Sequence, residues 1–163
     1  VGYSKAVELD WGQAISVGPA SVHFVECQHR SARGIHDQMR TLWGSFVIET
    51  DEGNIYFAGD TGYSPHFREQ GERFGPFALS IIPIGAYEPR AFMQASHLAP
   101  KQAVIAHQAL RSQQSLGIHF GVFQLTWEPV DQPLSDLTEA LSGAQIDPER
   151  FWTLEPGEFR TLP

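Results

Sequence analysis

The order of apolar and polar positions predicts a chain that is rich in strands at first and then alternates between strands and helices. Residues 14–28 indicate two short strands around a turn at Gly18-Pro19, because apolar and polar side chains partly alternate there. Residues 34–41 are polar and irregular, which is typical of a loop. Residues 43–60 predict a β-hairpin whose two apolar arms flank the turn-rich tetrapeptide 51–54.

The next segment predicts a short helix followed by a buried strand. Residues 64–75 have Ser64 as a candidate N-cap, Pro65 at the first helical position and Gly75 as the stop signal. Residues 77–85 are continuously apolar over the length of a strand, which is typical of a strand that is buried on both faces.

The last third continues the alternation. The pattern predicts a helix over 98–110, a short strand over 115–121, a helix over 135–144 with Ser135 as N-cap, and a final hairpin over 151–162 that turns at Pro156-Gly157. We therefore expect an α/β fold in one domain, residues 1–163, with one mixed sheet and helices on one face. No internal repeat or linker interrupts it.

Composition and charge exclude some functions. The chain has 11 basic and 19 acidic residues, a formal net charge of -8 and no cluster of Lys and Arg, which argues against nucleic-acid binding. Cys27 is the single cysteine, so no internal disulfide forms. No signal peptide or long apolar run is present, and we expect a cytoplasmic protein that makes at most peripheral membrane contact.

Candidate chemistry lies where apolar runs end. Of seven histidines, His29, His97 and His119 lie at or near such ends, and Asp60 closes the second arm of the predicted hairpin. Imidazole and carboxylate are zinc ligands, and a catalytic zinc lowers the pKa of water toward neutrality. Spacing alone leaves two alternatives open: Asp60 as an ordinary turn residue, and each histidine as a buried or solvated side chain.

Three segments resemble a known family. "LWGSFVIET", "FAGDTGYSPHFREQGERFGPFALSIIPIGAYEPRAFMQASHLAP" and "SLGIHFGVF" are similar to the C-terminal half of the N-acylphosphatidylethanolamine-hydrolysing phospholipase D group, within the metallo-β-lactamase superfamily. The resemblance runs from about residue 22 to residue 162. It implies half of an αββα sandwich and a zinc-dependent, phosphodiesterase-like hydrolase with two metal ions.

The resemblance also implies roles for individual residues. His29 resembles the histidine that completes one metal's ligand set, Asp60 the carboxylate that bridges both metals, and His119 the histidine that completes the second set. His97 is similar to a catalytic histidine near the substrate, within reach of a phosphate oxygen or the leaving group.

Three further residues of the similar block are candidates for substrate binding. Tyr63, Glu88 and Arg90 would form a wall of the pocket, with Arg90 favouring an anionic phosphate. The alternative for Tyr63 is packing in the core or a loop, and for Glu88 and Arg90 a local ion pair.

The family's leading metal motif, HxHxDH, does not occur in this sequence. We therefore expect a C-terminal half with an incomplete site, weak zinc binding and no hydrolysis on its own. The face of the sheet that the other half would cover is expected to pack on that half or on a second copy. Two alternatives remain open: a truncated, non-catalytic domain that serves binding or assembly, and a lactone or ester hydrolase of the same superfamily.

Overall fold

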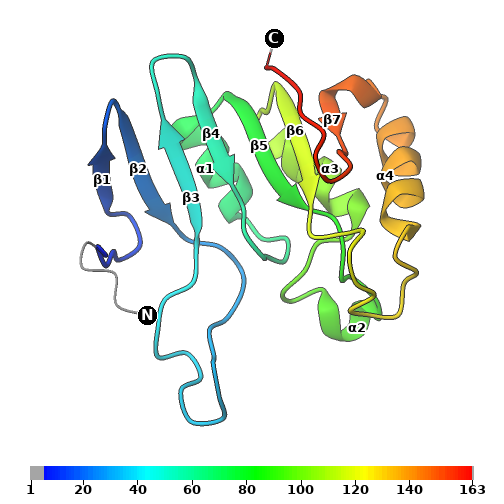
Figure 1. Cartoon of the computed structure of the whole chain (residues 1–163), viewed down its shortest axis with the longest axis horizontal. Helices are drawn as coiled ribbons and strands as arrows, with labels where there is room; N and C mark the ends of the chain where they lie inside the picture. The colour runs from blue at the N-terminus through cyan, green and yellow to red at the C-terminus, as the bar shows by residue number, and fades with distance from the viewer. Residues whose placement is uncertain (1–5, 163) are drawn as a thin grey trace.

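The computed structural model describes residues 6–162 (Figure 1). The strands are β1 (Ala14–Val17), β2 (Ala20–Val25), β3 (Ser45–Glu49), β4 (Asn54–Phe57), β5 (Phe77–Pro83), β6 (Gln114–Ile118) and β7 (Phe151–Trp152). The helices are α1 (His66–Phe74), α2 (Arg90–Met93), α3 (Pro100–Ala109) and α4 (Gln132–Gly143), with a 3₁₀ turn at Pro148–Arg150. None of the helices in this part of the chain is long and apolar enough to span a membrane, and the cytoplasmic location stays a prediction.

All seven strands form one sheet in chain order. The pairs from β1 to β4 are antiparallel, and those from β4 to β7 are parallel. Each parallel pair is connected through a helix, and right-handed crossovers bring such helices to the same face. In Figure 1, α1 and α3 lie behind the sheet and α4 lies beside α3 near the β7 edge. The prediction of a mixed α/β sheet with helices is confirmed.

The core lies between this sheet and the helices. On the helix-facing side, the strand registers align Val47, Tyr56, Ser80, Ser115 and Phe151 in one row, and all are buried. Side chains of the helices pack against this row; the ring of Phe67 on α1, for example, lies 6.1 Å from that of Tyr56. Burial on this side fixes the register, because a slip by one residue would exchange the two faces.

The opposite face of the sheet is apolar and partly open, which differs from the expectation for 77–85. A second row runs through Phe24, Phe46, Phe57, Ile81, Leu116 and Trp152. Phe46 and Phe57 are 37% and 38% exposed, and Ile81 is half-buried. Strand β5 is thus covered on its helix side and only partly on the other.

Two predicted elements differ at their ends. Helix α4 begins before Ser135, with Asp131 at the N-cap, because Pro133 fits the first helical turn; the Ser135 hydroxyl donates to the Gln132 carbonyl inside the helix. In α1 the N-cap is Pro65, while the Ser64 hydroxyl hydrogen-bonds the Nδ1 of His66.

The final hairpin prediction is wrong. Strand β7 has only two residues and pairs in parallel with β6. The turn at Pro156-Gly157 exists, but the segment after it pairs with no strand and exposes its apolar side chains, with Phe159 87% exposed. Helix α2 was not predicted; it is a single turn with no buried residue and therefore has no amphipathic pattern.

Candidate metal centre

Four chemically suited side chains meet at one edge of the sheet. Strands β2, β4, β5 and β6 run in the same direction, since β2 and β4 are both antiparallel to β3. Their carboxyl ends therefore share an edge, where open sheets commonly bind ligands. His29 follows β2, Asp60 follows β4, His119 follows β6, and His97 lies in the loop between α2 and α3.

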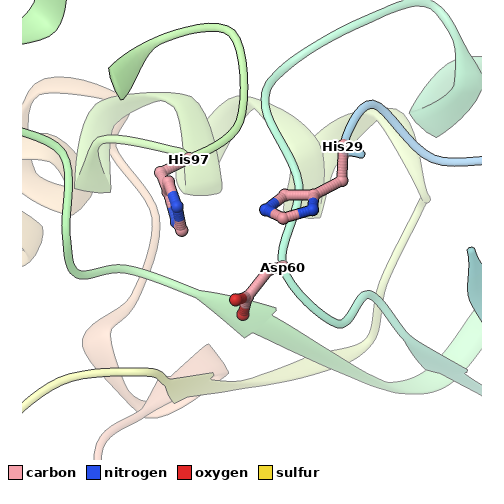
Figure 2. Close-up of side chains that lie close together, drawn as sticks. All are labelled: His29, Asp60 and His97. Carbon is pink, nitrogen blue, oxygen red and sulfur yellow. The ribbon is translucent and has the colours of Figure 1, made fainter. Parts of the chain in front are cut away.

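The four side chains are close together in space. His29, Asp60 and His97 each offer one ligand atom, and the three atoms lie within 4.8 Å of one another; Figure 2 shows the three side chains converging. The Nε2 of His119 lies 3.5 Å from an Asp60 carboxylate oxygen. The ring of His97 is 5.5 Å from that of His29 and 5.4 Å from that of His119.

Backbone hydrogen bonds fix His29 beside Asp60. Gln28 and Gly62 form an isolated antiparallel bridge in which the Gly62 amide donates to the Gln28 carbonyl at 2.8 Å. The fully buried hydroxyl of Thr61 accepts from the Gln28 amide at 3.0 Å. The two residues that follow Asp60 thus hold the residue that precedes His29, so both metal-ligand candidates share one local framework.

The loop that carries His97 is also held by side chains. The Gln28 amide side chain donates to the Ala95 carbonyl at 3.0 Å. The Arg90 guanidinium donates to the His97 carbonyl at 3.1 Å and to Gln102 at 2.7 Å. The His97 amide also donates to the carbonyl of Met93, the last residue of α2, at 2.8 Å. These contacts together hold the loop with the His97 side chain beside Asp60.

The cluster suits a divalent cation in its chemistry. Burial lowers the pKa of His97, the Asp60 charge opposes this, and the neighbouring His119 and His29 lower the pKa further, so its imidazole is neutral near pH 7. The Nδ1 atoms of His97 and His119 are buried, and neither finds a hydrogen-bond partner within residues 6–162. Neutral imidazoles around a carboxylate are the donor set that zinc prefers.

The expected substrate-binding residues lie around this cluster rather than in it. Tyr63 is half-buried, and its ring stacks on Phe67 at 5.7 Å. The Glu88 carboxylate accepts from the Arg90 amide at 3.0 Å, and the Arg90 guanidinium is used within the loop. Their role toward a substrate stays a prediction.

Glu88 and Arg90 line a groove of about 870 Å³ between α3 and α4. None of the four clustered residues lines this groove. Its walls include Lys101, Asp136 and Glu139, so the groove is a feature of the helix layer and not part of the cluster.

Several positioning residues escaped the sequence analysis. Thr61 and Gly62 lie in the block that resembles the family, but neither was among the candidate site residues. Glu128 is buried and accepts from the Tyr87 and Glu88 amides at 3.1 and 3.0 Å, which anchors the start of the His97 loop. No signal in the sequence identifies it, because Glu128 lies in an irregular, largely exposed loop.

Comparison with known proteins finds a matching family model and similar proteins. A family model described as "Beta-lactamase superfamily domain" matches residues 2–120. The chain is 35% identical over 164 residues to N-acyl-phosphatidylethanolamine-hydrolyzing phospholipase D 1 of Caenorhabditis elegans, covering 96% of this chain and 46% of that protein. It is 26% identical over 160 residues to a metal-dependent hydrolase of Methanopyrus kandleri, covering 96% of this chain and 63% of the relative.

A solved structure agrees in fold. A metallo hydrolase of Ignicoccus hospitalis superposes with a TM-score of 0.67 at 19% identity, covering 93% of this chain and 58% of that one. The chain thus spans about half the length of the proteins it matches. Since the family model covers most of the sequence and the Caenorhabditis relative aligns along nearly all of it, the chain belongs to the beta-lactamase superfamily.

Proposed function

We propose that the chain contributes to a zinc-dependent hydrolase that cleaves a phosphodiester or a related ester. The observation that carries the proposal is the convergence of three imidazoles on the Asp60 carboxylate at one sheet edge. The printed name of the Caenorhabditis relative, a phospholipase D, supports the phosphodiester class. The name of the Methanopyrus relative, a metal-dependent hydrolase, supports the need for a metal.

Each residue of the cluster has a defined part in this proposal. Asp60 has two carboxylate oxygens and can serve two cations, while His29 and His119 each serve one. When bound, zinc supplies Lewis acidity and lowers the pKa of water. His97 has the substrate-side role that the resemblance implies.

The proposal includes a partner for the open sheet face. The row from Phe24 to Trp152 is apolar, and a soluble protein rarely leaves such a surface uncovered. The sequence contains no HxHxDH motif, so the remaining ligands of a two-metal site would come from outside it. We propose that another segment with these ligands, or a second copy of the chain, covers the face.

The test uses the longest protein encoded by the reading frame that contains this sequence, loaded with zinc. Hydrolysis of bis(p-nitrophenyl) phosphate is measured for the parent, Asp60→Asn and the control Asp51→Asn, which changes an exposed turn carboxylate. We expect Asp60→Asn to lose activity at least about 100-fold, because even residues behind metal ligands cost 10- to 100-fold. Unchanged activity and unchanged zinc content in Asp60→Asn would refute the proposal.

The same assay separates the alternatives. A lactone or carboxylic ester hydrolase would cleave p-nitrophenyl acetate or a lactone but not the phosphodiester. The open apolar face favours the other alternative, a binding or assembly module. Such a module would show neither activity nor zinc in the longest encoded protein, and its association would survive Asp60→Asn.

A further inference from the structure

We infer that Glu128 is a positioning residue of this site: its carboxylate fixes the loop that carries His97, and through that loop it sets the rate of the chemical step without taking part in metal binding. The inference rests on the proposed function, which places His97 on the substrate side, and it deepens it by naming the group that holds His97 there. Glu128 lies outside the three segments that carry the resemblance.

The Glu128 carboxylate binds the start of this loop with both of its oxygens. Oε1 accepts from the Tyr87 amide at 3.1 Å, and Oε2 accepts from the Glu88 amide at 3.0 Å. The Trp127 amide donates in the other direction, to the Glu88 carbonyl at 3.3 Å. Because Glu128 is only 8% exposed, these bonds to a charged acceptor form with little competition from water.

The carboxylate is ionised at neutral pH although it is buried. Burial raises the pKa of Glu128, but the nearby Thr126 hydroxyl and the backbone amides of Glu128, Glu88 and Tyr87 lower it by more, so that it lies below the ordinary value. An ionised carboxylate only accepts hydrogen bonds, which is what two facing backbone amides require.

A short series of hydrogen bonds leads from Glu128 to His97. The Glu88 carboxylate accepts from the Arg90 amide at 3.0 Å. The Arg90 guanidinium donates to the Tyr87 carbonyl at 3.4 Å and to the His97 carbonyl at 3.1 Å. Arg90 thus joins the residues that Glu128 binds to the residue that carries the imidazole.

Apolar packing does little to fix the middle of this loop. Helix α2, which lies within it, has no buried residue, and its Phe92 is 79% exposed. A segment with few buried apolar contacts opens easily. The hydrogen bonds of Glu128 and Arg90 therefore supply much of what keeps the loop in one position.

The segment that carries Glu128 also carries His119. Both residues lie between β6 and α4, and the rings of His97 and His119 are 5.4 Å apart. Because one segment presents His119 and holds the His97 loop, the two imidazoles keep a defined relative position. A displaced loop would move His97 away from its place beside Asp60, which costs rate rather than metal.

The first experiment uses the longest protein encoded by the reading frame, loaded with zinc, and bis(p-nitrophenyl) phosphate. Glu128→Gln keeps the size of the side chain but turns one acceptor oxygen into a donor. We expect kcat to fall at least about 10-fold, because a misplacement of about 1 Å can cost about 100-fold, with KM changed less than about threefold and zinc content unchanged. The control Asp131→Asn changes an exposed carboxylate that makes no capping hydrogen bond, and it should match the parent.

A double-mutant cycle separates positioning from general support of the fold. In the His97→Ala protein, Glu128→Gln should lower kcat less than about threefold, because the residue through which it acts is absent. Glu128→Asp, which keeps two acceptor oxygens, should retain more activity than Glu128→Gln. Equal losses in the parent and in His97→Ala, or failure of both Glu128 variants to fold by circular dichroism, would show that Glu128 only supports the fold and would overturn the inference.

A further measurement does not depend on activity. In long-range ¹H–¹⁵N spectra of the same protein, the His97 ring signals, assigned by their loss in His97→Ala, should shift or broaden in Glu128→Gln and stay unchanged in Asp131→Asn. If they respond in this way but the parent hydrolyses no phosphodiester, the proposed function fails and Glu128 still positions His97. If they do not respond, the inference fails, and a loss of zinc and activity in Asp60→Asn would still support the proposed function.

Discussion

Two of the seven histidines, His66 on α1 and His107 on α3, are buried and do not belong to the four clustered side chains of the metal centre. Both are almost fully buried, and the Nδ1 of His107 hydrogen-bonds the Ser115 hydroxyl at 2.8 Å. Burial lowers the pKa of His66 to about 4. Burial, and to a lesser degree the charge of Arg150, lowers the pKa of His107 to about 4.

These two groups make the fold sensitive to acid. An unfolded histidine has a pKa of about 6.5, so between pH 6.5 and pH 4 the unfolded chain binds protons that the folded chain does not. The stability from the neutral ring is thus fully present above pH 6.5 and is lost as the pH falls toward 4. For His107 alone, the step from pH 7.5 to pH 5 should cost about 2 kcal/mol.

Urea unfolding at the two pH values measures this loss. We expect His107→Asn, whose amide can still hydrogen-bond Ser115, to be less stable at pH 7.5 but to lose about 2 kcal/mol less than the wild type on acidification. The exposed-site variant His36→Asn serves as control and should keep the wild-type slope. Equal slopes for His107→Asn and wild type would contradict the prediction.

The sequence separates these buried histidines from the clustered ones only in part. His66 and His107 lie within helices, whereas His29 and His119 follow strands, and this difference is visible in the pattern. His97 is different, because it lies in a loop well beyond β5. The His97 loop is held near Asp60 by the hydrogen bonds from Gln28 and Arg90. The pattern of apolar and polar residues does not reveal such bonds.

At the scale of elements, three loop segments meet at Gly62: its own segment after β4, the segment that contains Gln28, and the segment that contains Gln94 and Ala95. A Cβ at this position would lie 2.7 Å from the Gln94 carbonyl oxygen, 2.8 Å from the Gln28 side-chain nitrogen and 2.9 Å from the Ala95 carbonyl carbon. Two of these atoms belong to the backbone of the loop that carries His97. The missing side chain of Gly62 is therefore what lets this loop approach Asp60.

Gly62→Ala should separate the loops. We expect a loss of about 1–3 kcal/mol in the free energy of unfolding, from the forced backbone shift, together with weaker zinc binding. The matched control is Gly143→Ala in α4, where a Cβ meets nothing within 4 Å and alanine favours the helix, so stability should stay equal or rise. Urea unfolding and zinc calorimetry on both variants test this; full zinc affinity in Gly62→Ala would refute it.

The elements themselves were predictable where a pattern repeats. The Gly18-Pro19 and 51–54 turns, helix 98–110 and the strand near 115–121 all appear close to their expected places. The final hairpin was wrong because Pro156-Gly157 is a real turn signal, but the chain after it has no partner strand. Turn chemistry is local, whereas pairing depends on which sheet edge is free.

At the scale of the whole molecule, the two faces of the sheet differ in what covers them. Helices cover one face, where the row from Val47 to Phe151 is buried. The other face presents the apolar row from Phe24 to Trp152, with a further apolar row of Val22, Ile48, Ile55 and Leu79 beside it. The row from Phe24 to Trp152 crosses β2 and β4 close to their carboxyl ends, beside the metal-centre edge. Covering this face and completing the metal site are thus geometrically linked, because a layer over the sheet would also reach its edge.

This asymmetry predicts how the 163-residue chain behaves in solution. Without a covering segment, the apolar row should drive self-association, seen by sedimentation equilibrium, and should bind the dye ANS. Phe57→Glu places a charge on a side chain that is 38% exposed in the middle of the row, and it should weaken association at least about 10-fold, as loss of a central aromatic anchor does. Ile105→Glu, at a 41% exposed position on α3 in the helix layer, is the matched control and should leave association unchanged. If the wild-type chain is a monomer that binds no dye at high concentration, the face needs no partner. If both variants weaken association equally, the helix layer takes part in the contact, and the sheet face alone does not drive association.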